Sequence, residues 1–142
     1  MKSIQASPLL KTALLADAAV SAAAAALQLA IPDGLAELLR LPRVLLVETG
    51  AFLAIYVVLL VAMARATRLW SPLVWVVVIG NVGWALGCVG LAVSPIPGAL
   101  GAAFLLAQAL AVLVFATLEY RGLKSSAPRY ADRPTPMPTR NG

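Results

Sequence analysis

Residues 72–98 read PLVWVVVIGNVGWALGCVGLAVSPIPG, and this stretch decides the fold class. Residues 72–93 are almost wholly apolar, and their length is close to the ~20 residues that a helix needs to cross a bilayer. Pro72 stands at a first-turn position, where a helix accepts proline. Two prolines in the connector 94–98 stop one helix and start another. The stretch therefore predicts a membrane-spanning helix and a tight turn into a second one.

Three further apolar blocks of similar length occupy residues 9–31, 44–64 and 98–120. The whole chain is 61% hydrophobic and 12% charged, whereas a soluble domain is about 45–50% apolar and about 25% charged. Too few polar residues remain to cover a soluble globule. The sequence therefore predicts an all-α membrane protein, in which residues 1–124 form a four-transmembrane-helix bundle.

Positive charges are distributed unevenly over the segments that join these blocks. If the N-terminus is inside, the outer segments carry only Arg40 and Arg43. The inner segments carry the other basic residues: Lys2, Lys11, Arg65, Arg68, Arg121, Lys124, Arg129, Arg133 and Arg140. This bias predicts that both termini are cytoplasmic. It also accounts for the net charge of +5 through topology and lipid headgroups, so we expect no nucleic-acid partner.

The segment between the first two blocks, residues 32–43, carries an amphipathic pattern. Leu35, Leu38 and Leu39 share one helical face, and Asp33 stands where it could cap the N-terminus of a helix. We expect a short helix lying on the outer membrane interface. A plain loop is the alternative, because so short a helix is weak by itself.

The two ends of the chain are read from their composition. Residues 125–142 are rich in proline and basic residues and poor in large apolar ones, which predicts a disordered cytoplasmic tail. At the other end, a basic start followed by an apolar run could be a cleaved signal peptide. The length of the run 9–31 and the presence of Asp17 argue for a retained helix instead.

The chain has no histidine and one cysteine, Cys88. A single cysteine forms no internal disulfide or CxxC pair. Without histidine, a bis-histidine haem and a typical zinc site are excluded. The sequence also lacks a nucleophile with an adjacent base and a phosphate-binding loop, so we expect no cofactor, no metal and no enzymatic activity.

Polar side chains inside a membrane span are costly and are therefore candidate functional groups. The candidates here are Asp17, Ser21, Gln28, Glu48, Asn81 and Gln108. Asp17, Ser21 and Gln28 lie on one face of the first predicted helix. Glu119 stands at the inner boundary, where we expect it to be solvated.

Depth along the helices predicts two pairs among these groups. Gln28 and Glu48 lie at similar distances from the outer loop, and Asn81 and Gln108 both lie near the middle of their helices. Each pair could form an interhelical hydrogen bond that fastens the bundle. Alternatively, Asp17 and Glu48 take up and release protons or hold a cation.

The third apolar block presents two different faces. Gly83, Gly87 and Gly90 fall on one side, where a second helix could approach closely. Asn81 and Trp84 fall on nearly the opposite side. A helix with two contact faces belongs either in the centre of the bundle or at the interface of an oligomer, and the sequence leaves both open.

Several motifs in the second half give the chain a resemblance to a group of small bacterial four-helix membrane proteins. The motifs are Asn-x-x-Trp in helix three, Ala-Gln-Ala in helix four and a closing Glu/Gln-Tyr-x-Gly-Leu. The matching residues are Asn81, Trp84, Ala107, Gln108, Ala109, Glu119, Tyr120, Gly122 and Leu123. An early Asp17 and the Leu41-Pro42 pair also fit, so the resemblance covers residues 9–124. It implies a four-helix membrane fold in a bacterial inner membrane, but no particular activity.

Two classes of function follow from these patterns. The first is a structural or accessory membrane protein, which packs with itself or with a larger membrane partner through its small residues and paired amides. The alternative is a small proton- or cation-coupled transporter or channel subunit that uses Asp17 and Glu48. In both cases the lipid bilayer is a direct partner, and a homo-oligomer is expected in the second because four helices enclose little space.

Overall fold

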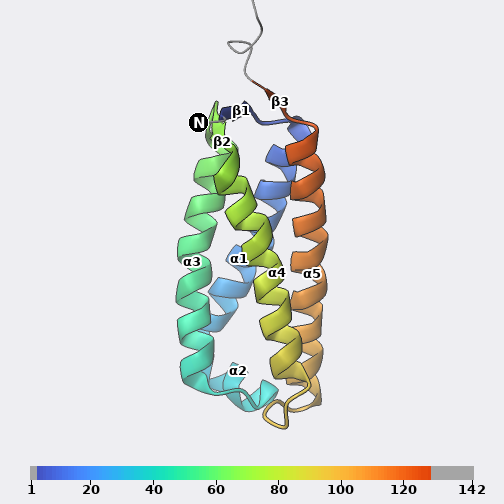
Figure 1. The fold of residues 1–142 in the computed structure, drawn as a ribbon. Coiled ribbons are helices and arrows are strands. Elements are labelled where there is room, and N and C mark those ends of the chain that lie inside the picture. Colours follow the sequence, from blue (N-terminus) through green and yellow to red (C-terminus); the bar gives the residue numbers. More distant parts are fainter. Residues whose placement is uncertain (1–2, 129–142) are drawn as a thin grey trace, which may run out of the picture.

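The computed structural model describes residues 3–128, which fold into five helices and three very short strands (Figure 1). In chain order they are β1 (Ser3–Gln5), α1 (Pro8–Ala30), α2 (Pro32–Leu39), α3 (Arg43–Arg65), β2 (Leu69–Trp70), α4 (Ser71–Ala92), α5 (Ala99–Lys124) and β3 (Ala127–Pro128). The prediction of an all-helical architecture is confirmed.

Four of the helices, α1, α3, α4 and α5, are long and apolar enough to cross a membrane. Their bounds agree with the predicted spans, except that α5 continues to Lys124 instead of ending at residue 120. Large apolar side chains cover the outside of the bundle: Ile55 is 74% exposed, and Val58 and Leu86 are each 69% exposed. Such a surface suits contact with lipid chains better than contact with water.

The long helices pack as two pairs. α1 packs against α3, and α4 packs against α5; the pairs are joined where α1 meets α5. α3 and α4 have little direct backbone contact, and they approach each other through side chains. α2 lies across the end of the bundle that is remote from the chain termini (Figure 1).

A serine starts the first long helix and also attaches it to the last one. The Ser7 hydroxyl oxygen accepts a hydrogen bond from the Leu10 amide at 3.2 Å, which satisfies one of the donors that a helix N-terminus leaves without a partner. The same hydroxyl donates to the carbonyl of Gly122 at 2.8 Å. Ser7 therefore fixes the position of α1 relative to the end of α5.

The short helix expected between the first two spans is present as α2. Leu35 and Leu39 are buried, whereas Leu38 is 59% exposed, so the apolar face is narrower than predicted. The prediction that Asp33 caps this helix is wrong, because no side chain caps it. Instead the Asp33 carboxylate accepts a 2.6 Å hydrogen bond from Arg43 at the start of α3.

Three segments that are far apart in sequence meet at the terminal end of the bundle. They form a small antiparallel sheet with the strand order β2-β1-β3. Residues 125–142 were expected to be disordered, yet Ala127 and Pro128 form strand β3 and the hydroxyl of Ser126 accepts a hydrogen bond from the Ser7 amide at 3.0 Å. The rest of that predicted tail, residues 129–142, lies outside the described residues.

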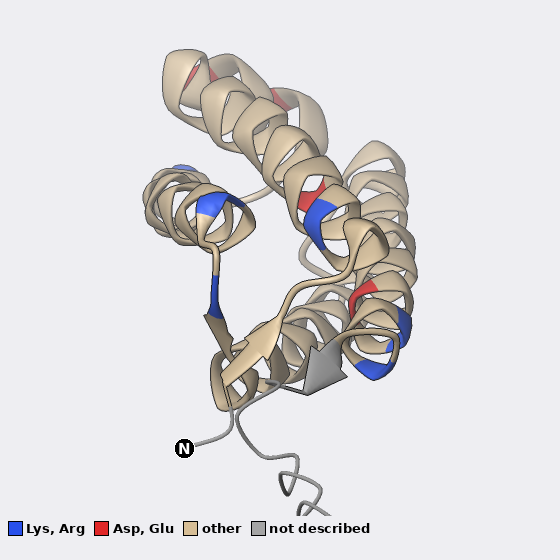
Figure 2. Cartoon of the chain, turned by 90° about the horizontal axis from the view of Figure 1, so that it is seen from above, with Lys and Arg blue, Asp and Glu red and all other residues tan. Residues whose placement is uncertain are grey.

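The basic residues in the described part of the chain collect at the terminal end. Figure 2 looks onto this end of the molecule. Lys11, Arg65, Arg68, Arg121 and Lys124 lie near it, whereas the opposite end has Arg40 and Arg43. The helix directions therefore place the basic residues as the charge pattern required, with both described ends of the chain on one side (Figure 1).

Close packing between the helices depends on glycines other than the predicted ones. A Cβ atom on Gly122 would lie 2.7 Å from the Cα of Leu10, and one on Gly101 would collide with the carbonyl oxygen of Leu39. Both positions thus require glycine for the approach of α1 and α2 to α5. By contrast, a Cβ on Gly83 or Gly87 would meet nothing within 4 Å.

Candidate functional site

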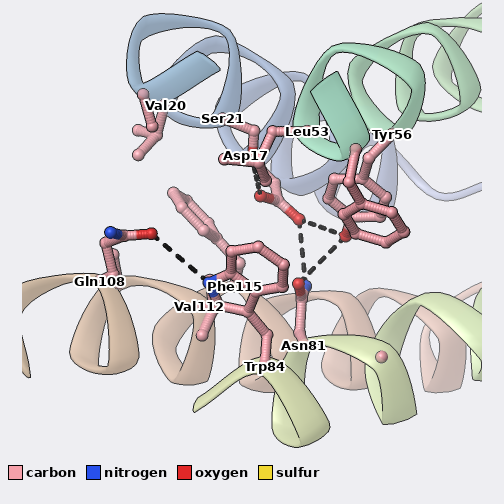
Figure 3. A pocket seen from close by; sticks show the side chains of 14 residues that line it. Asp17, Val20, Ser21, Leu53, Tyr56, Asn81, Trp84, Gln108, Val112 and Phe115 are labelled. Carbon is pink, nitrogen blue, oxygen red and sulfur yellow. Dashed lines mark hydrogen bonds between the residues drawn. The ribbon is translucent and has the colours of Figure 1, made fainter. Parts of the chain in front are cut away.

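The carboxylate of Asp17 is the centre of a buried polar group in the middle of the bundle. Its side chain is 0% exposed. One oxygen, Oδ1, accepts a hydrogen bond from Ser21 at 3.0 Å. The other, Oδ2, accepts bonds from the Tyr56 hydroxyl at 2.9 Å and from Asn81 Nδ2 at 3.0 Å. Figure 3 shows these donors converging on Asp17 from α1, α3 and α4.

A second carboxylate shares the amide of Asn81. The Nδ2 atom of Asn81 lies 3.2 Å from Oε2 of Glu119, and Glu119 is 0% exposed. Its other oxygen, Oε1, is buried and has no hydrogen-bond partner among the described residues. Glu119 was predicted to be a solvated end residue. That prediction is wrong because α5 continues past it, so it lies within the helix and faces the bundle.

No basic side chain balances these two carboxylates within the described residues. The ion pair in residues 3–128 joins Arg43 to Asp33 at the end of the bundle near α2, where both side chains are exposed. Buried charges in proteins are normally paired, because desolvation of an isolated charge is very costly. Two carboxylates that share one amide donor therefore call for a proton or a bound cation between them.

The hydroxyl of Tyr56 has two acceptors within reach. Asp17 Oδ2 lies 2.9 Å from it and Asn81 Oδ1 lies 3.1 Å from it. A tyrosine hydroxyl carries a single hydrogen, so it donates to only one of them at a time. Rotation of this hydroxyl can therefore strengthen or withdraw a hydrogen bond to Asp17 without any movement of the helices.

A cavity of about 110 Å³ adjoins Asp17 and Asn81 (Figure 3). Its wall is mostly apolar and includes the aromatic side chains of Phe52, Tyr56, Trp84 and Phe115. The ring of Phe52 stacks on Tyr56 at 6.4 Å and on Trp84 at 5.7 Å between centroids. This row of rings connects α3 to α4, where the two backbones have little contact.

A larger cavity of about 400 Å³ lies on the side of α2. Gln28, Thr49 and Phe104 are among the residues that line it. Trp84 and Gln108 line both cavities, and the indole nitrogen of Trp84 lies 3.4 Å from Oε1 of Gln108. These two side chains thus stand at the boundary between an inner cavity with a carboxylate and an outer, larger one.

Both predicted amide pairs are wrong. Gln28 is 1% exposed, but its Oε1 accepts from Thr49 at 2.6 Å and not from Glu48, which is exposed. Glu48 and Thr49 are neighbours in sequence and lie at almost the same depth, but their side chains point in different directions. Depth alone therefore could not show which of them meets Gln28. Asn81 likewise binds Asp17 and Glu119, whereas Gln108 binds Trp84.

Of the predicted site residues, Asp17, Ser21 and Asn81 come together around one point, and Glu48 lies apart from it. Tyr56 and Glu119 are the members that sequence reasoning missed. The motif Glu-Tyr-x-Gly-Leu contained a signal for Glu119, because the residue three positions later, Gly122, packs directly against α1.

The glycine face of α4 is not closely packed within one chain, because a Cβ atom on Gly83, Gly87 or Gly90 would meet nothing within 4 Å. Gly83, Gly87 and Gly90 are all exposed, and Gly83 and Gly87 line the larger cavity together with residues of α1, α3 and α5. The choice between the bundle centre and an oligomer interface therefore stays open for this face. Residues 3–128 also contain no group of three or more potential metal ligands among His, Cys, Asp and Glu. The chemistry available at the site is that of carboxylates, amides, a hydroxyl and aromatic rings.

Comparison with known proteins adds no relative: no family model, curated protein or solved structure matches this chain.

Proposed function

We propose that this protein is a small proton-coupled carrier of cations in a bacterial inner membrane, and that Asp17 and Glu119 are its coupling groups. The observation that carries the proposal is the pair of buried carboxylates bridged by Asn81. A carboxylate within a membrane span is retained at considerable cost, and such groups mark ion paths and proton relays. Glu119 takes the role that the sequence suggested for Glu48.

The surroundings of the pair support exchange between a proton and a cation. Without a basic partner, two ionised carboxylates carry a charge of −2, and a proton or a monovalent cation bound between them lowers this to −1. Asp17 also faces a cavity, which gives a ligand access to it. Binding of a cation there favours release of a proton, because both neutralise the same two groups.

Orientation and environment belong to the same proposal. The basic end of the bundle faces the cytoplasm, so the chain termini are cytoplasmic and α2 lies on the outer interface. The lipid bilayer covers the apolar outer surfaces of α3, α4 and α5. On its motifs, we also propose membership in the group of small bacterial four-helix membrane proteins that the sequence resembles.

Proton movement in reconstituted vesicles tests the proposed function. Vesicles with an acidic interior and an internal pH dye are challenged with external sodium, potassium or benzyltrimethylammonium. We expect at least one of these cations to release protons from wild-type vesicles. Asp17→Asn should lower the rate by at least about tenfold, equivalent to ~1.4 kcal/mol in the barrier.

Glu48→Gln is the matched control, because it removes an exposed carboxylate from an adjacent helix. This variant should transport at the wild-type rate. Proton release by none of the three cations, or an unchanged rate in Asp17→Asn, would contradict the proposal.

A structural or accessory role is the second candidate, and the exposed glycines of α4 favour it. A Cβ on Gly83, Gly87 or Gly90 would meet nothing within 4 Å, and Gly83 and Gly87 line the larger cavity. The open side of this cavity leaves room for the approach of a helix from a second copy or a larger partner. Small residues at this spacing allow close helix approach in membranes. The two candidates are compatible, since a carrier of this size gains an enclosed path by forming an oligomer.

A further inference from the structure

We infer that the inner cavity binds the head of a hydrophobic quaternary ammonium compound, with its positive charge beside Asp17. The inference rests on the proposed function, in which Asp17 binds a cation, and it names the class of that cation. Four features carry it: the charge of the site, the three hydrogen-bond donors already on Asp17, the aromatic lining of the cavity, and its access from the bundle surface.

The charge of the site selects a cation. Asp17 lines the inner cavity, and Glu119 lies behind it, bridged by Asn81. Glu119 Oε1 is buried without a hydrogen-bond partner among the described residues. The local field in this part of the bundle is therefore negative, and a ligand anion would be repelled.

The hydrogen bonds around Asp17 favour a cation that has no N–H groups. Ser21, Tyr56 and Asn81 already donate to the two oxygens of Asp17. They occupy three of the about four acceptor positions on a carboxylate, so a primary ammonium, which has three N–H donors, could place at most one of them on Asp17 without displacing a donor. A quaternary ammonium needs no acceptor, because its charge is spread over methyl groups and it interacts through electrostatics alone.

The lining of the cavity suits the same kind of ion. Phe52, Tyr56, Trp84 and Phe115 contribute to its wall, and the faces of aromatic rings attract cations, quaternary ammonium groups in particular. A divalent metal ion would need about six oxygen ligands. The described residues offer no cluster of three acidic, histidine or cysteine side chains for it.

Size and access fit an amphiphilic molecule. A dry cavity of about 150 Å³ holds benzene, so the inner cavity of about 110 Å³ is of the right order for a trimethylammonium head. Two of its lining residues on α3 and α4 reach the outside of the bundle, since Phe52 of α3 is 55% exposed and Gly80 of α4 is also exposed. A compound dissolved in the bilayer can therefore enter sideways between α3 and α4.

Binding to the full chain in detergent micelles tests the inference by calorimetry. The probe is benzyltrimethylammonium, and the matched ligand is neopentylbenzene, which has the same shape and no charge. We expect the cation to bind at least about tenfold more tightly, a difference of ~1.4 kcal/mol. This comparison uses only the wild-type protein, so it does not depend on the folding of any variant.

Variants then locate the site. Asp17→Asn should weaken binding of the cation by at least about tenfold, and Phe52→Leu should weaken it severalfold, whereas Glu48→Gln should leave it unchanged. Equal affinity for both ligands would overturn the inference and leave only an apolar pocket. So would the absence of binding of the cation, or wild-type binding in Asp17→Asn.

The outcomes also separate this inference from the proposed function. If external sodium or potassium drives protons out of the vesicles but benzyltrimethylammonium does not bind, the organic cation is not the ligand. The proposal of a proton-coupled carrier would then still stand. Asp17-dependent binding of the organic cation without proton release by any cation would keep the site and reject the coupling.

Discussion

Asn81 organises the buried polar group because one atom of its side chain serves both carboxylates. Its Nδ2 donates to Asp17 and Glu119, while its Oδ1 lies within reach of the Tyr56 hydroxyl. An amide is well suited to this position, since it offers donors and an acceptor without adding a charge. Asn81 on α4 is thus hydrogen-bonded to α1 and α5, and the Tyr56 hydroxyl brings α3 into the same group.

Removal of this amide should show which groups depend on it. Asn81→Ala leaves two buried carboxylates without their shared donor, and we expect a loss of about 2 kcal/mol in the free energy of unfolding. When Glu119→Ala is added, the loss should be smaller than the sum of the single losses, with a coupling of about 1 kcal/mol. Unfolding of detergent-solubilised protein measures both quantities.

The pair Asn81→Ala and Glu48→Ala provides the control for this cycle. Glu48 is exposed and does not contact Asn81, so the two losses should add. Additivity in the Asn81 and Glu119 cycle would mean that the bridge between α4 and α5 contributes nothing to stability.

Sequence reasoning found Asp17, Ser21 and Asn81 because a polar residue in an apolar helix is conspicuous by itself. It did not find the partners, because a partner depends on which helices are neighbours and on how each one is rotated. Depth along the helices predicts a partner at a similar depth for Gln28 and for Asn81. The rotation of each helix about its own axis selects a different partner in both cases. For Gln28, the rotation of α3 turns Thr49 toward it and leaves Glu48 on the outside of the bundle.

At the scale of elements, the extent of each helix was predictable and the packing faces were not. Apolar blocks and prolines mark where helices begin and end, and these signals are local. A glycine signals only that close approach is possible. The structure uses this possibility at Gly101 and Gly122 and leaves Gly83 and Gly87 exposed, a choice that depends on the arrangement of all the helices.

Two leucine substitutions distinguish these kinds of glycine. Gly122→Leu places a side chain against the backbone of Leu10, so we expect a loss of about 1–3 kcal/mol in stability from overpacking. Gly87→Leu should cost the single chain almost nothing. If α4 forms an interface with a second copy, Gly87→Leu should instead lower the mass of the complex measured by native mass spectrometry.

Either result has a clear reading. Wild-type stability of Gly122→Leu would show that α1 and α5 do not approach as closely as described. An oligomer whose mass is unchanged by Gly87→Leu would remove the accessory role based on the glycine face of α4.

At the scale of the whole molecule, the sheet and α2 cover opposite ends of the bundle. The sheet β2-β1-β3 lies at the basic end and α2 at the other. The polar group around Asp17 lies between two apolar clusters. One contains Leu14 and Val77, and the other contains Leu39 and Leu105. The carboxylates are therefore separated from both ends of the bundle by apolar layers, and the lateral cavities are their nearest connection to the outside.

Cysteine labelling of intact bacterial cells tests the orientation. In a Cys88→Ser background, Glu37→Cys places a thiol on the exposed side of α2, and Thr67→Cys places one between α3 and α4. A membrane-impermeant maleimide should label the first from outside and the second only after the cells are permeabilised, because we propose that the basic end faces inward. The opposite pattern would reverse the proposed topology.

The small sheet also has a consequence for how the chain is made. Strand β1 is synthesised first, yet one of its partners, β3, follows the last helix. During synthesis the N-terminal strand can pair with β2 only after two long helices are in place, and its second edge stays open until residue 128 has been translated. The sheet is therefore complete only after all four long helices have been synthesised. A chain stopped before Ala127 would lack the pairing of β3 with β1.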